Sequence, residues 1–431
     1  MFAVLAAGLI AIPSGAREWT LDECIDHAIT HNITVQQRAL DCANAKQAVI
    51  EAQDGYLPTL SAGASQSWNF GRGLTADNTY AHRNTSSFGW QIGLNLPLFQ
   101  GLHNFRQVAY AKANLAAVLD GFEAAKDDVT LRVMSQYLQT LYCSEMTGVA
   151  KSQVDMAYHL LGRQEARLNE GIIPEADLLD MRAQLAQAEM QFTTAQNDHM
   201  LARLDLIQLL RLDESPTDFS VVSLSDNEPV INDPQVVYDR AMTFNPYVSS
   251  ARSRINAADK AIRVAQTGWI PRLSFNAGLG SNYYTMSGGY SDSFGAQMRH
   301  NFSQSVGFSL SVPIFDAFST RNSVRRARVQ HDVALLDYES AADELYKTIN
   351  QAYYQAVGAR EKLHSAEAAA TASEAAMNAM LEKYSIGRAS YTDYENARTA
   401  WIKAEADRIQ AKYELQLRAR ILAFYCERHS N

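Results

Sequence analysis

Five carboxylate side chains follow two glycines that stand at similar places in the two halves of the chain. They are Glu175, Asp177 and Asp180 after Gly171, and Asp393 and Glu395 after Gly387. Copies of such carboxylates around a symmetry axis form a ring that attracts cations and repels anions. Acids early in a helix also interact favourably with the helix dipole. Both interpretations stay open, and the first predicts a cation-attracting constriction.

No other pattern in the chain indicates catalysis or metal binding. The sequence has no GxSxG, no Walker loop, no GxGxxG that opens a helix after a strand, and no HExxH. His27 and His31 have the spacing of two metal ligands on a helix, but no third ligand accompanies them, which favours packed or solvated histidines. The net charge is -9, without a basic run. We expect a protein that is not an enzyme, uses no cofactor or metal and binds no nucleic acid.

The elements that must position the acids occur twice in the chain. Two pairs of segments show the duplication: residues 55–61 (GYLPTLS) with 268–274 (GWIPRLS), and residues 96–99 (LPLF) with 312–315 (VPIF). A shift of roughly 215 residues also relates Gly171 to Gly387 and Asp177 to Asp393. The sequence therefore predicts two repeats of one design, residues 17–230 and 231–431.

Each repeat has two segments in which apolar and small polar residues alternate, which predicts strands with one apolar face. The four segments are residues 59–71, 86–99, 272–284 and 302–315. The clearest has large apolar residues at every second position: Phe88, Trp90, Ile92, Leu94, Leu96 and Leu98. Strands of about 11 to 13 residues are near the length that a tilted strand needs to cross a bilayer. The uncharged Gly, Ser and Asn between the apolar residues suit a barrel lumen.

A soluble sheet with one wet face is the commoner alternative. Aromatic residues at the strand ends, such as Trp68, Phe99 and Phe315, favour a membrane barrel, because such residues form girdles at membrane interfaces. Four strands cannot close a barrel, and an open sheet edge cannot face lipid. Several chains must therefore pool their strands, and the residues alone leave two, three or four copies open.

The sequence predicts two helical hairpins, residues 102–212 and 318–426, because no proline interrupts their first helices between Gly101 and Gly171 and between Ala317 and Gly387. Their first helices measure roughly 100 Å at 1.5 Å per residue, and their apolar residues recur at the three- and four-residue steps of coiled-coil seams. Two further helices, residues 20–54 and 234–267, complete the return paths. The linker 213–233 and the C-terminus would then form a belt at mid-height. An ordinary coiled-coil stalk is the alternative for the helices alone.

The N-terminal residues 1–16 predict a signal peptide, because an apolar run precedes small residues, although the charged leader is missing. Cys24 stands outside a lipidation context, so we expect no N-terminal lipid anchor. Cys24 and Cys426 are both expected near the belt, where a disulfide is an alternative to free thiols.

The paired segments at 55–61 and 268–274, the turns at 169–172 and 384–387, and the opening at 19–25 resemble the TolC-like outer membrane efflux proteins. The resemblance covers essentially the whole chain after residue 16. It implies an α+β membrane protein, a homotrimer with a twelve-stranded barrel in outer-membrane lipid, four strands per chain, and an α-helical tunnel through the periplasm.

The same resemblance implies a passive exit channel of a tripartite efflux or type I secretion system. A periplasmic adaptor (membrane fusion) protein and an inner-membrane pump of the RND, ABC or MFS type would open its periplasmic tip. A non-channel coiled-coil scaffold of the cell envelope is the alternative function. The sequence does not identify the cargo, the pump or the adaptor.

The resemblance also implies roles for residues near the two turns. Tyr384, Asp177 and Asp393 match family positions that tether the closed state and ring its constriction. Arg388 stands one residue before the position of the tethering Arg and is a candidate gate tether with Tyr384. Asp180 and Glu395, which closely follow the same turns, complete the candidate selectivity ring of Asp177 and Asp393. The candidate adaptor-docking residues are Gly171, Ile172, Ile386 and Gly387. Two departures leave the gate contacts open: Ala389 stands where the family has a tethering Arg, and Asn396 where a second ring aspartate often lies.

Overall fold

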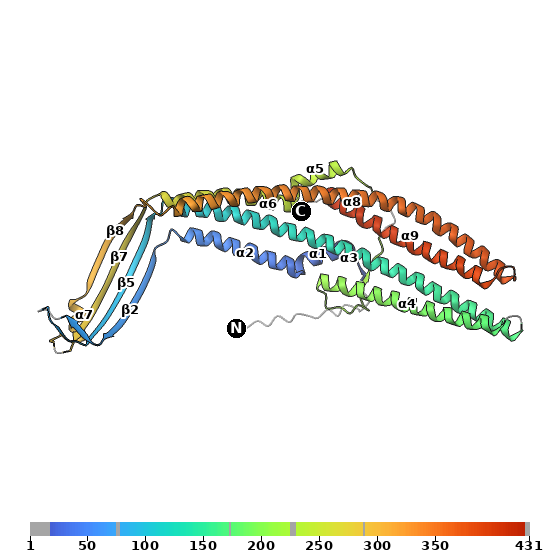
Figure 1. The fold of residues 1–431 in the computed structure, drawn as a ribbon, viewed down its shortest axis with the longest axis horizontal. Coiled ribbons are helices and arrows are strands. Elements are labelled where there is room, and N and C mark those ends of the chain that lie inside the picture. Colours follow the sequence, from blue (N-terminus) through green and yellow to red (C-terminus); the bar gives the residue numbers. More distant parts are fainter. Residues whose placement is uncertain (1–17, 75–77, 172–173, 225–229, 288, 427–431) are drawn as a thin grey trace, which may run out of the picture. The chain divides into compact units, whose positions relative to one another are not determined.

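The computed structural model describes residues 18–74, 78–171, 174–224, 230–287 and 289–426 (Figure 1). The predicted signal peptide, residues 1–16, and Ile172 lie outside the described residues. In chain order the elements are β1 (Glu18–Trp19), α1 (Leu21–His31), α2 (Ile33–Asp54), β2 (Thr59–Asn69), β3 (Arg72–Leu74), β4 (Tyr80–His82), β5 (Thr85–Phe99), α3 (His103–Asn169), α4 (Glu175–Leu210), β6 (Ser220–Val221), α5 (Pro234–Phe244), α6 (Pro246–Ala265), the 3-10 helix η1 (Gln266–Trp269), β7 (Arg272–Met286), α7 (Phe294–His300), β8 (Ser303–Ser311), α8 (Ser319–Ser385) and α9 (Tyr391–Cys426).

The chain folds into two compact units. One combines the residues up to 40, residues 120–249 and the residues from 339 onward, and the other combines residues 41–119 and 250–338. The first holds the hairpin turns and the second holds the four long strands. Each unit draws on both predicted repeats, so the compact units cut across the division that the sequence suggests.

Two asparagines interrupt the helices that the sequence predicts to be continuous over residues 20–54 and 234–267. The Asn32 N–H donates to the Ala28 carbonyl at 2.8 Å, and the Asn32 Oδ1 accepts from the Thr34 N–H at 2.9 Å. Asn245 ends α5 and caps α6 in the same manner. Asparagine is a favoured N-cap because its side chain satisfies a free N–H of the next helix. Each repeat thus has a helix joint at the corresponding place.

The largest hydrophobic core lies in the first unit and surrounds Tyr137 of α3. The Tyr137 hydroxyl donates to the carbonyl oxygens of Trp19 at 3.1 Å and Val222 at 2.6 Å. These bonds hold β1 and β6, which pair in parallel, and the adjacent Phe219 is fully buried. The linker, predicted as a loop, therefore contributes a short strand and a core aromatic residue.

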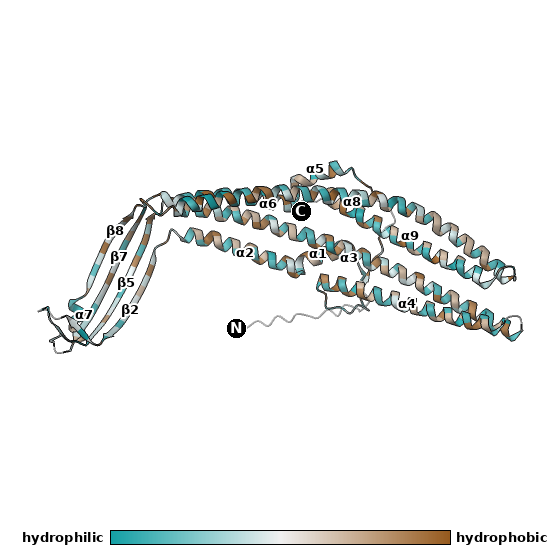
Figure 2. Ribbon diagram, viewed as in Figure 1, coloured by the Kyte–Doolittle hydropathy of each residue, from teal (hydrophilic) through white to brown (hydrophobic). Residues whose placement is uncertain are grey.

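The four long strands form one antiparallel sheet in the order β2-β5-β7-β8. Residues directly opposite each other share a face: Leu94 stands opposite Leu60 and Ala277, and Asn95 stands opposite Thr59 and Asn276. All four strands therefore place most of their apolar residues on one face and most of their Gly, Ser and Asn on the other, as predicted. Figure 2 shows this alternation along the strands.

Two strands are shorter than predicted, and β2 loses only its last two residues, since it ends at Asn69 and not at residue 71. β8 covers Ser303–Ser311 and not residues 302–315, because proline has no N–H to donate to a strand ladder and Pro313 lies just beyond. Pro97 has a smaller effect in β5, where the pairing register with β7 shifts between Pro97 and Phe99.

The short helix α7 takes the place of a strand beside the outer part of β7, beyond the last paired residue Gly280. The Gln297 side-chain amide accepts from the Tyr284 N–H and donates to the Tyr284 carbonyl, both at 3.0 Å. Phe294 packs against Phe88 and Tyr283 of the apolar face. This helix is not predicted from the sequence, because its segment has the composition of a polar loop.

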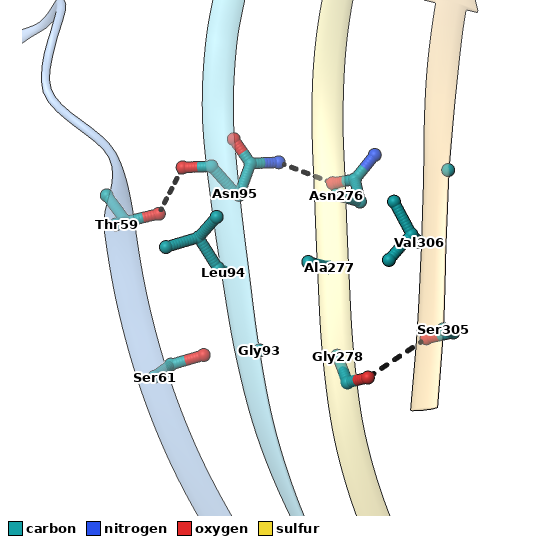
Figure 3. A pocket seen from close by; sticks show the side chains of 11 residues that line it. Thr59, Ser61, Gly93, Leu94, Asn95, Asn276, Ala277, Gly278, Ser305 and Val306 are labelled. Carbon is teal, nitrogen blue, oxygen red and sulfur yellow. Dashed lines mark hydrogen bonds between the residues drawn. The ribbon is translucent and has the colours of Figure 1, made fainter. Parts of the chain in front are cut away.

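The polar face of the sheet is hollowed. A hollow of about 430 Å³ has a lining drawn mostly from that face, including Thr59, Asn95 and Asn276 (Figure 3). Asn95 Nδ2 donates to Asn276 Oδ1 at 2.9 Å across the strands. At Gly280 a Cβ atom would lie only 2.6 Å from the Trp90 carbonyl oxygen, so this close approach of β5 and β7 requires glycine. The small residues thus line the concave side, as a barrel lumen requires.

None of the described helices is both long and apolar enough to cross a membrane. The described cysteines are free thiols, so the alternative of a Cys24–Cys426 disulfide is not formed. Cys24 is fully buried, and the Cys426 sulfur accepts a hydrogen bond from Arg240 Nη1 at 3.5 Å.

Tyr137→Phe tests the importance of the belt hydrogen bonds. The variant lacks the hydroxyl that donates to the buried Trp19 carbonyl and the partly buried Val222 carbonyl, so we expect the free energy of unfolding to fall by about 1–3 kcal/mol. Thermal unfolding of the detergent-extracted protein, followed by circular dichroism, measures the change. Tyr353→Phe, at the corresponding place in the second repeat, is the control. Equal midpoints for the two variants would contradict a special role for Tyr137.

Candidate functional site

The glycines of the two hairpin turns have nearly the same φ angle. Gly171 and Gly387 have φ values of 75° and 74°, a left-handed region in which glycine is not strained. The Gly171 N–H donates to the Leu168 carbonyl at 2.8 Å, and the Arg388 N–H donates to the Lys383 carbonyl at 2.8 Å. These bonds satisfy carbonyl groups that the ending helices leave free.

The predicted ring acids fall into two groups. The side chains of Asp177, Asp180 and Asp393 are exposed near the starts of α4 and α9. Glu395 is half-buried, and its carboxylate accepts from Arg398 Nη1 at 2.9 Å. Three of the four predicted ring acids are therefore free of ion pairs among the described residues, whereas the fourth is engaged within α9.

Asp393 also takes part in the cap at the start of α9. The Asp393 Oδ2 accepts from the Ser390 N–H at 3.1 Å, and the Ser390 Oγ accepts from the Asp393 N–H at 3.1 Å. This reciprocal arrangement is a capping box. The hydrogen bonds from Ser390 lower the pKa of the Asp393 carboxyl. The helix-start role that the sequence analysis kept open thus has a structural basis for this residue.

A cluster that the sequence analysis missed joins the two hairpins of one chain. The Tyr391 hydroxyl of α9 bonds with the Gln184 amide of α4 and donates to the Glu395 carboxylate at 3.2 Å. With its nitrogen turned toward α9, the Gln184 amide also reaches that carboxylate at 2.9 Å. Burial and the Glu395 charge raise the pKa of Tyr391, which keeps its hydroxyl protonated as a donor.

The buried Arg398 guanidinium makes it costly to expose this cluster to solvent. Its side chain is only 6% exposed, and its ion pair with Glu395 is correspondingly shielded from solvent. A buried charge that loses its partner is costly, by about 3–5 kcal/mol in measured cases. Any movement that separates α4 from α9 must therefore leave the Glu395–Arg398 pair intact or rehydrate both groups.

Aromatic side chains pack around the cluster. The rings of Tyr384 and Tyr394 stack with centroids 6.0 Å apart, and Tyr394 is fully buried with its hydroxyl 3.4 Å from the Met156 sulfur of α3. Leu160 of α3 and Met377 of α8 complete the small core. All four helices of the two hairpins thus meet within a few turns of Gly171 and Gly387.

The two predicted tethers have different surroundings. Burial raises the pKa of Tyr384, Arg167 opposes this effect, and the Asp177 charge adds to it. The structure therefore brings Tyr384 and Asp177 into the same electrostatic environment. Arg388 is exposed, and its guanidinium has no ion pair among the described residues. Of the predicted docking residues, Ile386 is 65% exposed beside Gly387.

One further contact joins the hairpins above the turns. Lys412 Nζ of α9 lies 3.1 Å from the Glu145 Oε1 of α3. Next to it, the rings of Tyr142 and Tyr413 pack edge to face with centroids 6.4 Å apart. The hairpins are therefore connected at two separate levels, by an ion pair here and by the buried cluster near the turns.

The spacing of residues in the sequence indicates part of this cluster. Tyr391, Glu395 and Arg398 stand at i, i+4 and i+7, a spacing that places them on one helix face. Gln184 belongs to another helix, and nothing in the sequence relates it to Tyr391. A search for polar residues at coiled-coil seam positions would have found the first three residues only.

Comparison with known proteins places this geometry in context. The family model described as "Outer membrane efflux protein" matches residues 24–210 and 237–425. The outer membrane efflux protein BepC of Brucella suis is 20% identical over 96% of this chain and 86% of its own. The outer membrane protein TolC of Escherichia coli is 22% identical over 95% of this chain and 82% of its own. The crystal structure of the Campylobacter jejuni CmeC outer membrane channel has a TM-score of 0.73 at 18% identity, over 94% of this chain and 85% of its own.

The pH dependence of the α9 start tests the Asp393 cap. A lowered pKa means that the ionised carboxylate stabilises the folded helix start. This contribution is present above the ordinary aspartate pKa of about 4 and is lost as the pH falls through the lowered value. We expect amide-exchange protection of residues 390–394, corrected for intrinsic rates, to fall only at such acidic pH. Asp393→Asn should remove this pH dependence, and the exposed Asp180→Asn should leave it unchanged; an effect of the same size in both variants would contradict the cap.

Proposed function

The chain belongs to the outer membrane efflux protein family, and from this premise we propose how its hairpin turns close and open a channel. The protein is an outer-membrane exit channel for efflux or secretion. The observation that carries this function is the curved sheet. One of its faces is apolar, its concave face carries small polar residues, and each of its edge strands, β2 and β8, pairs with a neighbour on one side only. A coiled-coil scaffold, the alternative function, leaves the apolar face of this sheet without a role.

Three copies pool their strands in the proposed assembly, which gives a twelve-stranded barrel in outer-membrane lipid. Each copy contributes two hairpins to a periplasmic tunnel. A periplasmic adaptor docks at the turns, where Gly171, Ile172, Ile386 and Gly387 lie, and an inner-membrane pump of the RND, ABC or MFS type supplies the energy. The channel itself carries out no chemistry and uses no cofactor.

In this proposal the exposed carboxylates near the turns form the selectivity ring. Asp177, Asp180 and Asp393 are exposed, and threefold repetition brings like charges together around the axis. Such a ring attracts cations and repels anions. Glu395 joins it only when its ion pair with Arg398 breaks.

The closed state depends on the cluster that joins α4 to α9. The Tyr391–Gln184 bond and the contact of the Tyr394 hydroxyl with the Met156 sulfur connect the two hairpins of one chain, which supports a tether role for this region. Since Ala389 cannot serve as a tethering Arg, Tyr391 and Gln184 provide a polar tie in its place. Opening therefore separates α4 from α9 when the adaptor docks and the coils untwist.

Neutralising the ring tests the selectivity proposal. The double variant Asp177→Ala, Asp393→Ala should lower the cation preference and change the single-channel conductance, because each copy loses two carboxylates near the constriction. The reversal potential in a KCl gradient across a planar bilayer measures the preference. Ser390→Ala weakens the α9 cap but keeps the ring charge, so it should retain the wild-type reversal potential. A double variant with unchanged conductance and preference would show that these carboxylates form no ring.

Removing the hydroxyl of Tyr391 tests the tether. Tyr391→Phe keeps the ring in the aromatic packing but loses the bond to Gln184, so we expect longer and more frequent openings in single-channel recordings. Gln184→Ala should act in the same direction. Tyr158→Phe, an exposed tyrosine of α3, is the matched control. Wild-type opening in both cluster variants would place the closing contacts elsewhere.

A further inference from the structure

A single charged residue occurs in the four long strands. β2, β5, β7 and β8 contain only apolar and uncharged polar residues except for Arg272, the first residue of β7. The corresponding residue of the first repeat is Thr59, the first residue of β2. The two repeats therefore differ in charge at the start of the sheet, which the duplication itself does not require.

The strand register assigns Arg272 to the polar concave face. It stands opposite Ser311, and the next residues of β7 on the same face are Ser274 and Asn276, since successive side chains alternate between faces. Asn276 in turn lines the hollow of Figure 3. On the opposite face Leu273 and Phe275 stand beside Leu310 and Phe308. A lipid-facing position for Arg272 would need a one-residue slip of the whole strand.

Within the part of the chain that the structure describes, no carboxylate neutralises this cation. The Arg272 guanidinium is exposed, and no carboxylate within the described residues forms an ion pair with it. Its charge acts on the surroundings, because the pKa of His103, lowered first by burial, is lowered further by Arg272. An unpaired arginine presents its guanidinium donors to any anion that passes.

We propose that Arg272 forms an anion-attracting collar in the lumen where the strands begin. This inference rests on the proposed function, because three copies must surround one lumen. Its ligands are small inorganic anions and the carboxylate or phosphate groups of anionic cargo. The collar is opposite in sign to the carboxylates near the hairpin turns. At physiological salt its reach is about 8 Å, the Debye length, so it acts on solutes near the wall.

Charged thiol reagents applied to the trimer in detergent test the collar locally and do not depend on the state of the gate. Ser274→Cys places a thiol on the same face roughly 7 Å from Arg272. We expect the anionic methanethiosulfonate reagent to react faster, relative to the cationic one, than it does in the double variant Ser274→Cys, Arg272→Gln. The rate ratio should differ by roughly fivefold at 10 mM salt and converge at 1 M salt, as screening predicts.

Three controls use the same strand and the same chain. Asn282→Cys places a thiol on the same face roughly 33 Å from Arg272, so Arg272→Gln should not change the rate ratio at this thiol. Thr59→Arg adds a second cation per copy and should raise the preference for the anionic reagent at Ser274→Cys. Arg272→Lys keeps the charge and should keep the wild-type ratio. The unsubstituted protein gives the background from Cys426, the one described cysteine that is not buried.

The outcomes separate the collar from the channel itself. A thiol at position 274 that reacts, with a rate ratio independent of Arg272, overturns the collar and leaves the lumen intact. If neither reagent reaches a thiol at position 274 while Phe275→Cys reacts, the two faces of the sheet are the reverse of those assigned. This result would overturn the proposed channel together with the collar.

Discussion

The alternation of side chains along the strands is the constraint on which the rest of the structure depends. A one-residue slip of a strand moves all of its apolar side chains to the other face. The register between β2 and β5 is continuous from the Asn69–Thr85 pair to the Thr59–Asn95 pair, and the register between β5 and β7 is continuous from the Thr85–Met286 pair to the Pro97–Ser274 pair. The positions of Asn95, Asn276 and Arg272 all follow from it. The one irregularity, at Pro97, lies at the end where the strands meet the helices.

The two repeats differ in the surroundings of one arginine near the hairpin turns. Arg398 of the second repeat is buried and paired with Glu395 of its own helix, whereas Arg182, at the corresponding place in the first repeat, is exposed and pairs with Glu165 across its hairpin at 3.1 Å. One arginine therefore stabilises a single hairpin, and the other belongs to a cluster that joins both. The duplication placed an arginine at equivalent positions of both repeats, and only the buried one, Arg398, belongs to the cluster that couples the hairpins.

The strands and long helices could be predicted because their period is local. Phe88 to Leu98 shows the two-residue period of a strand, and the turns at Gly171 and Gly387 each need a residue free to adopt positive φ. The joints at Asn32 and Asn245 were missed because a polar residue interrupts an amphipathic helix without changing its period. The cluster around Gln184 was missed because its partners come from different helices, and α7 because side chains replace a strand there.

The edges of the sheet are not alike, since β2 forms one and β8 forms the other. Association through unlike edges is head-to-tail, and such contacts give either closed rings or open filaments. The curvature of the sheet affects whether successive chains close into a ring or continue as an open filament. Gly280 permits β7 to approach β5 more closely than any side chain would allow. A side chain at position 280 would therefore move β7 away from β5 and change the spacing of the strands between the two edges.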